Sequence, residues 1–240
     1  MKINWNYIKG SLLLGLVAFL YSFTHQKHTA RKVYNITVEF EQGENLFMNY
    51  EMVNKLLIQK GKSVLNEAKT VIDLQKLEAN VLSHSMVEKA AVFLTVDGVL
   101  KTKIKQRTPI ARVMSNTNSY YIDKQATIMP LSENHSARVL LVSGNITEND
   151  IDEIYLLVTT ILEDDFLKKQ IIGVQKTKQH QYVLKTRIGE QNIELGTIEN
   201  LNSKFKNLKS FFNKTMADET IDKYTSINLK FNNQVVCTKK

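Results

Sequence analysis

The stretch VLKTKIKQRTPIAR, residues 99–112, decides how the chain is organised. Its first part, Val99–Arg107, carries a basic residue at every second position from Lys101 on, which predicts a strand. A second apolar run, Met86–Val96, precedes it, and Asp97-Gly98 lies between the two runs. Asp-Gly in that position predicts a β-hairpin. The stretch therefore closes one folded region, and Pro109 begins the next.

The region before the hairpin predicts one more strand and two helices. Val33–Phe40 alternates in the manner of a strand. Residues 49–58 have helical spacing of their apolar side chains, and Asp73 can cap a further helix that presents Leu77 and Val81 on one face. The predicted order over about 75 residues is β-α-α-β-β, a complete small α/β unit.

The region after the hairpin predicts mostly strands. A helix should begin at Thr147 and run to about Phe166, and another should span Ile198–Phe212. The predicted strands are residues 119–131 (two strands and a turn), 139–142, 171–177, 181–188, 191–195, 224–231 and 234–238. The last two are joined at Asn232-Asn233. The fold class is therefore α+β, with a mixed β-sheet and two helices in the second region.

The N-terminus carries an uncharged apolar run, Gly10–Phe23. Its 14 residues cover roughly 21 Å as a helix, whereas the hydrocarbon core of a bilayer is about 30 Å thick. Extension back to Trp5 adds Lys9, which can snorkel to the headgroups. We therefore expect a transmembrane helix over Trp5–Phe23, and membrane contact through it.

Two other interpretations of the run stay open, and so does its direction. A cleaved signal peptide has the same order of charge and apolar residues, but no Ala-x-Ala-like site follows. A buried core helix fits poorly with the polar stretch THQKHTARK that comes next. Lys2 and Lys9 precede the run, while Lys27, Arg31 and Lys32 follow it, so charge alone does not favour a cytoplasmic N-terminus.

The chain has a formal net charge of +8, from 32 basic and 24 acidic residues. The basic residues are spread along the sequence, whereas a nucleic-acid-binding protein concentrates them on one face. An anionic membrane surface would account for a mildly basic domain as well as DNA would. We expect no nucleic-acid partner.

Motifs that carry chemistry are absent from the sequence. It contains no nucleophile elbow, P-loop, dinucleotide fingerprint or zinc-binding helix motif. His25 and His28 are the only close pair of histidines, and that spacing alone is weak evidence for a metal. Cys237 is the only cysteine and has no neighbouring histidine to activate it, and the adjacent carboxylates Glu163–Asp165 do not point at one site. We expect no catalytic residue, metal, cofactor or small-molecule substrate.

Several of these segments together resemble the FtsQ/DivIB family of bacterial cell-division proteins. The matching features are Q-R-x-P-I-A-R at residues 106–112, Tyr120-Tyr-Ile-Asp123, Met129-Pro-Leu131 and Leu140-Leu-Val-Ser-Gly144. Tyr224–Phe231 resembles the penultimate strand of that family. The sequence departs from the family pattern at Gln106 and Asn228, where acidic residues are usual, at Gln125-Ala126 in place of a turn glycine, and at Ser136–Arg138, which lacks a proline. The tail before the apolar run is also very short.

The resemblance implies three parts. Residues 1–32 would be a short cytoplasmic tail, a transmembrane helix and a juxtamembrane segment; residues 33–107 a POTRA domain; and residues 108–240 the β domain. The protein would cross the bacterial inner membrane once, with its N-terminus in the cytoplasm and its ectodomain in the periplasm at the division septum.

The resemblance also implies a function without catalysis. The protein would be a divisome scaffold that binds FtsB-like and FtsL-like bitopic division proteins, and other divisome components, and regulates septal peptidoglycan synthesis. A terminal strand leaves backbone groups that a partner strand can pair with. The expected partner-binding residues lie on or beside that strand: Phe231, Gln234, Val235, Val236 and Cys237. Another hypothesis is a POTRA-containing periplasmic module for outer-membrane or secretion machinery, which would not need the second region.

Overall fold

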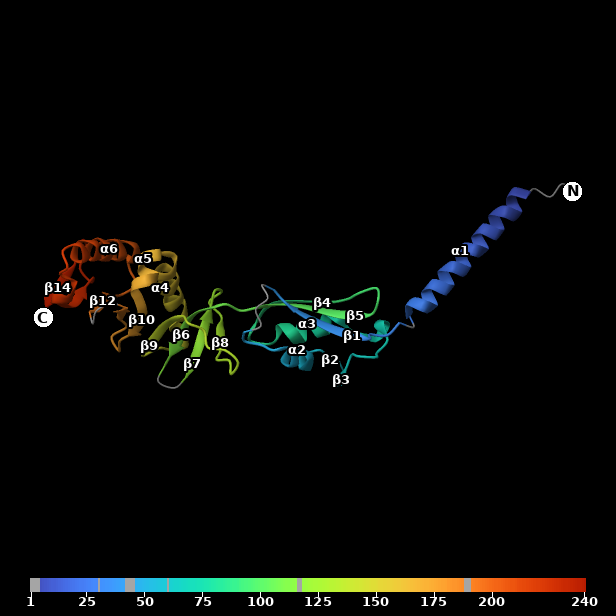
Figure 1. Ribbon diagram of the computed structural model, residues 1–240, viewed down its shortest axis with the longest axis horizontal. Coiled ribbons are helices and arrows are strands. Elements are labelled where there is room, and N and C mark those ends of the chain that lie inside the picture. Colours follow the sequence, from blue (N-terminus) through green and yellow to red (C-terminus); the bar gives the residue numbers. More distant parts are fainter. Residues whose placement is uncertain (1–4, 30, 42–45, 60, 116–117, 188–190) are drawn as a thin grey trace. The chain divides into compact units, whose positions relative to one another are not determined.

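The chain divides into two compact units, Met1–Gln106 and Arg107–Lys240 (Figure 1). The structure, a computed structural model, describes residues 5–29, 31–41, 46–59, 61–115, 118–187 and 191–240, without the side chains of residues 6–8 and 24–29. The architecture is α+β with a large sheet in the second unit.

The N-terminal helix α1 spans Trp5–Thr29. In the part of the chain that the structure describes, no helix combines the length and the apolar character needed to cross a membrane. The prediction of a transmembrane helix over Trp5–Phe23 is therefore wrong. The physical reason lies in the composition of the helix: its uncharged run has only 14 residues, and Lys9 and Lys27 lie on either side of it within the same helix.

The rest of the first unit has the predicted β-α-α-β-β order, with short additions. Its main elements are β1 (Asn35–Phe40), α2 (Tyr50–Leu56), α3 (Leu74–Leu82), β4 (Val87–Leu94) and β5 (Val99–Gln106). The additions are β2 (Ile58–Gln59), β3 (Lys62–Ser63) and the 3-10 helix η2 (Lys69–Val71). Strand β5 lies in the centre of a three-stranded sheet, parallel to β1 and antiparallel to β4.

Local signals in the sequence explain these elements. Asp73 caps α3 as predicted, because its carboxylate accepts a hydrogen bond from the backbone N–H of Lys76. The predicted hairpin between β4 and β5 is confirmed. Gly98 has a φ of +103° in its turn, and a Cβ there would lie 2.6 Å from the carbonyl oxygen of Lys32. Only glycine fits that turn.

In its described residues, the second unit is built on one mixed sheet of nine strands. The strands are β6 (Pro109–Met114), β7 (Ser119–Asp123), β8 (Ile128–Pro130), β9 (Leu140–Gly144), β10 (Ile171–Lys176), β11 (Tyr182–Thr186), β12 (Asn192–Gly196), β13 (Tyr224–Asn228) and β14 (Val236–Lys239). Their order across the sheet is β14-β13-β12-β11-β10-β9-β6-β7-β8. The pairs β6/β9, β9/β10 and β12/β13 are parallel. Ile188, the expected end of β11, lies outside the described residues.

Three α-helices accompany this sheet in the described residues, one more than expected. They are α4 (Ile151–Glu163), α5 (Asp165–Gln170) and α6 (Leu201–Ala217), with the 3-10 helices η3 (Glu148–Asp150) and η4 (Ile221–Lys223). The single helix predicted to run to Phe166 breaks at Asp164. The side chain of Asp164 accepts hydrogen bonds from the N–H groups of Phe166 and Leu167, and so it starts a new helix.

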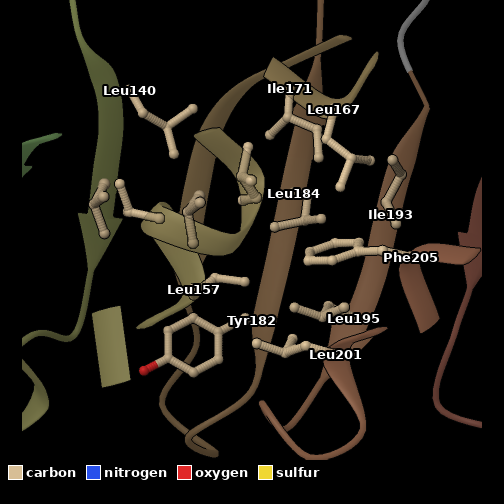
Figure 2. Close-up of a cluster of buried hydrophobic side chains, with 14 of the residues drawn as sticks. Leu140, Leu157, Leu167, Ile171, Tyr182, Leu184, Ile193, Leu195, Leu201 and Phe205 are labelled. Carbon is tan, nitrogen blue, oxygen red and sulfur yellow. The ribbon is translucent and has the colours of Figure 1, made fainter. Parts of the chain in front are cut away.

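Helices α4 and α6 pack on one face of the sheet and form its core (Figure 2). Leu157 of α4 and Phe205 of α6 meet side chains from the middle strands, among them Leu184, Ile193 and Leu195. All five side chains are almost fully buried. Burial on this scale contributes about 1.5–3 kcal/mol for each large apolar side chain, so the helices and the sheet stabilise each other.

A buried ion pair ties the start of α4 to the end of β10. The ammonium of Lys176, which is fully buried, contacts the carboxylate of Asp150. Asp150 also accepts hydrogen bonds from the N–H and O–H of Thr147, at 2.8 and 2.9 Å. Burial alone would raise the pKa of Asp150, but Lys176 and Thr147 more than offset it and hold that pKa below its ordinary value.

This pair should make stability depend on pH. Because the pKa of Asp150 is lower in the folded state, its contribution is present at pH 7 and is lost as the pH falls below the ordinary aspartate pKa and through the lowered one. Asp150→Asn should lower the free energy of unfolding at neutral pH by roughly 3 kcal/mol. Urea unfolding at several pH values should show that the difference in unfolding free energy between this variant and the native chain shrinks on acidification. Asp152→Asn, at an exposed carboxylate, is the control and should change the free energy of unfolding little. A difference between Asp150→Asn and the native chain that does not depend on pH would contradict the role given to the Asp150–Lys176 pair.

Candidate functional site

The candidate site is the free edge of β14, the last strand of the sheet. The inner side of β14 is paired: the N–H of Lys240 donates to the carbonyl of Lys223 at 2.9 Å, and Thr225 Oγ1 donates to the carbonyl of Thr238 at 3.3 Å. Backbone groups of successive strand residues point to opposite sides. The N–H and C=O groups of Cys237 and Lys239 therefore face the free edge.

Side chains of the same segment alternate between the two faces of the sheet. Val235 and Cys237 are half-buried and pack against the hydrophobic core. Val236 is 44% exposed on the other face. Phe231, at 49%, and Gln234 are exposed in the turn that precedes β14. Of the five predicted residues, the strand holds Val236 and Cys237, while the preceding turn holds the other three.

The opposite edge of the sheet is less suited to strand pairing. It is formed by β8, which has three residues and ends in Pro130. Proline has no N–H to donate, and short strands that contain it are a common means of protecting an edge. No proline occurs in β14 or in the turn before it. Of the two edges in the described sheet, β14 is the longer one and has an N–H group on every residue.

A network around Glu194 supports the β13–β14 hairpin from the adjacent strand. The carboxylate of Glu194 accepts hydrogen bonds from Ser226 (3.3 Å) and from the side-chain amide of Asn228 (3.1 Å), and it pairs with Lys230 (3.0 Å). Asn228 stands where the family pattern has an acidic residue. An aspartate would repel Glu194, whereas the amide donates to it. The departure at Asn228 is visible in the sequence, but its partner is not, because Glu194 comes from β12.

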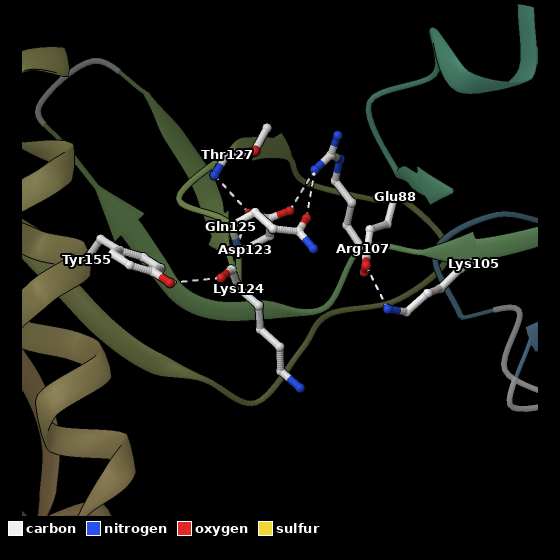
Figure 3. A network of polar contacts seen from close by, with 8 residues as sticks. All are labelled: Glu88, Lys105, Arg107, Asp123, Lys124, Gln125, Thr127 and Tyr155. Carbon is white, nitrogen blue, oxygen red and sulfur yellow. Dashed lines mark hydrogen bonds and ion pairs between the residues drawn. The ribbon is translucent and has the colours of Figure 1, made fainter. Parts of the chain in front are cut away.

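The motif residues around Arg107 form a structural clasp (Figure 3). Arg107 Nη1 donates to Asp123 Oδ2 at 2.8 Å, and Asp123 is 1% exposed. The other oxygen of Asp123 accepts from the N–H groups of Gln125 and Thr127, at 2.9 and 2.8 Å. The clasp holds the segment before β6 to the turn between β7 and β8. These motif residues therefore position strands rather than bind a ligand.

The described residues hold no group of three or more His, Cys, Asp or Glu side chains suited to a metal. The side chains of His25 and His28 lie outside the described residues. Burial raises the pKa of the Cys237 thiol, which disfavours the reactive thiolate. In the acidic run 163–165, Asp164 caps α5 and pairs with Lys209. Lys209 and the capping N–H groups hold the pKa of Asp164 below its ordinary value.

The fold and this edge define an α+β protein whose large sheet has one edge open to strand pairing. The family model described as FtsQ/DivIB, C-terminal related matches residues 108–238, more than half of the chain. The chain belongs to this family, as its motifs suggested, and is a cell division protein. No curated protein matches the chain.

The clasp leads to a prediction about stability. Asp123→Ala should lower the free energy of unfolding of the second unit by about 3–5 kcal/mol, because it leaves the half-buried Arg107 without its carboxylate partner and two backbone N–H groups without an acceptor. Urea unfolding measures the change. Glu133→Ala, at an exposed carboxylate, is the matched control. Equal stabilities of the two variants would contradict the structural role of the clasp.

The turn inside the clasp leads to a second prediction. Ala126 has a φ of +59°, a backbone conformation that strains any residue with a Cβ, and it occupies the place of the family's turn glycine. Ala126→Gly should therefore raise the free energy of unfolding by about 0.5–1 kcal/mol. Ala79→Gly, inside α3, should lower it by about 1 kcal/mol. A loss of stability in Ala126→Gly would show that the turn is not strained.

Proposed function

We propose that this chain is a non-catalytic scaffold of the bacterial divisome that binds FtsB-like and FtsL-like partners and thereby regulates septal peptidoglycan synthesis. Its place of action would be the periplasm at the division septum. The observation that carries the proposal is the free edge of β14, combined with membership of a cell-division family. The family match covers residues 108–238, the region that a secretion or outer-membrane module would not need.

Binding would proceed by strand addition. A partner strand would pair with the outward N–H and C=O groups of Cys237 and Lys239. The exposed side chains of Val236 and Phe231 would give it an apolar contact, while Gln234 would lie beside it. Val235 and Cys237 would support the strand from the core side rather than touch the partner directly. The β-α-α-β-β order of residues 33–107 supports a POTRA domain as the second part of the scaffold.

The outward N–H of Lys239 allows a sharp test of strand addition. Lys239→Pro removes that donor without touching the paired groups of Thr238 and Lys240, and Lys239→Ala removes the side chain but keeps the donor. Lys239→Pro should weaken binding of a purified FtsB-like protein about tenfold, and Lys239→Ala by much less. Binding is measured by titration with the full chain. Equal affinities of the two variants would rule out pairing at this edge.

The side-chain contact is tested separately. Phe231→Glu with Val236→Glu changes exposed positions only and should abolish capture, whereas a change at Val235 would disturb the core. In cells, photo-crosslinkers at positions 231 and 236 should yield adducts with FtsB-like proteins.

Depletion of the protein should give filaments with unfinished septa. Normal division after complete depletion would overturn the function, whatever the edge binds.

A further inference from the structure

A groove of about 680 Å³ opens in the second unit where the three parallel strands β6, β9 and β10 begin. Parallel strands start at the same end of a sheet, so Ile110, Leu140 and Ile171 come together there and line the groove. Each is at least nine-tenths buried. Ile172 is added to this lining by the bulge in β10 and is 44% exposed. The floor is thus aliphatic and partly open to solvent.

Four cationic side chains also line the groove, and each comes from a different connection of the fold. Lys124 follows β7, Arg138 precedes β9, Lys168 lies in α5 and Arg187 follows β11. All four are exposed. Among the described residues, no carboxylate lines the groove. Four separate segments therefore bring positive charge to one apolar hollow, although they are up to 63 residues apart in the sequence.

Hydrogen bonds fix the positions of two of these four residues in the fold. The N–H of Arg187 donates to the carbonyl of Gln170 at 2.7 Å, and its side-chain Nε donates to the carbonyl of Lys169 at 2.9 Å. The carbonyl of Lys124 accepts from the hydroxyl of Tyr155 at 2.9 Å (Figure 3). These bonds fix where the two residues leave the sheet.

The positive charge of the groove is not neutralised within the described part of the second unit. The ion pairs there join Arg107, Lys176, Lys209 and Lys230 to carboxylates, and none involves the four groove cations. Among the described residues, Asp165 is the one acidic residue in the neighbouring hollow, which Lys168, Lys169 and Arg187 also line. An incoming carboxylate would therefore meet unpaired cations at the rim, where Coulomb attraction is only partly screened.

We propose that this groove binds an acidic peptide segment of a partner protein, in which carboxylates alternate with aliphatic residues. The aliphatic side chains would cover the floor around Ile172 and Leu140, and the carboxylates would pair with Arg138 and Lys168 at the rim. A volume of this size suits a short segment of chain. In the described part of the chain no aromatic side chain lines the groove to stack a base, and a free phosphate would leave the aliphatic floor in contact with water.

The surface is distinct from the β14 edge. Strands β11, β12 and β13 separate β10 from β14 in the sheet. The groove relies on side-chain charge and apolar contact, whereas the edge relies on backbone pairing. The second unit therefore has two proposed binding surfaces that differ in chemistry. They would serve two partners, or two segments of one partner. Loss of one binding mode leaves the other intact, so the two proposals fail separately.

The probe for this groove is a fluorescein-labelled peptide of alternating Glu and Leu, titrated with the full chain and followed by fluorescence anisotropy. Arg138→Glu with Lys168→Glu should weaken binding by at least about tenfold. Raising the salt from about 50 mM to about 200 mM should weaken binding to the native chain and affect that variant less. Ile172→Ser should weaken binding several-fold with the salt dependence unchanged, because it removes apolar contact only.

Lys178→Glu with Lys214→Glu makes the same change of net charge at exposed lysines outside the groove and is the matched control. It should keep the affinity of the native chain, and circular dichroism should show that all variants fold. If the control and the groove variant lost affinity for the peptide equally, the effect would come from net charge alone, and the proposal would be overturned. The proposal would also be overturned if the peptide did not bind, while phosphatidylglycerol vesicles bound the native chain but not the groove variant.

Discussion

The pairing of backbone groups along an open sheet is the constraint on which the second unit depends. Each internal strand satisfies its N–H and C=O groups on both sides, but an open sheet must end twice. The two ends of this sheet are treated differently. Strand β8 is short and ends in Pro130, whereas β14 pairs with β13 along its four residues and leaves Cys237 and Lys239 with groups directed outwards. A chain that needs to recruit another strand can do so only where such groups remain.

The same sheet explains why a binding edge can be held firmly. Strand β13 is parallel to β12, and Glu194 of β12 joins Asn228 and Lys230 on the β13 side of the hairpin. On the other face, Val235 and Cys237 reach the core that α6 completes. The edge is therefore supported from both faces, and the partner strand that we propose would meet a strand that is already ordered.

The motifs that identify the family serve mainly to position strands. Arg107 and Asp123 close the turn between β7 and β8, and Ala126 accepts a strained backbone in the place of a glycine because Asp123 binds the N–H groups on either side of it. These residues mark where the second unit begins. Neither of the two surfaces proposed for partners uses them, so sequence motifs and binding surfaces are largely separate in this chain.

The sequence by itself determined the elements whose signals are local. The Asp97-Gly98 hairpin, the Asp73 cap and the strand character of the last segment depend on neighbouring residues, and the structure has them. Family membership also followed from residues that lie in order along the chain. The transmembrane helix was wrong because the apolar run is too short, and the break at Asp164 was missed because its side chain caps a new helix. Only the tertiary structure decided the order of the nine strands, the partner of Asn228 and the gathering of four cations around Ile172. Each of these depends on pairing between segments far apart in sequence, and strand pairing of that kind has no signal within any one segment.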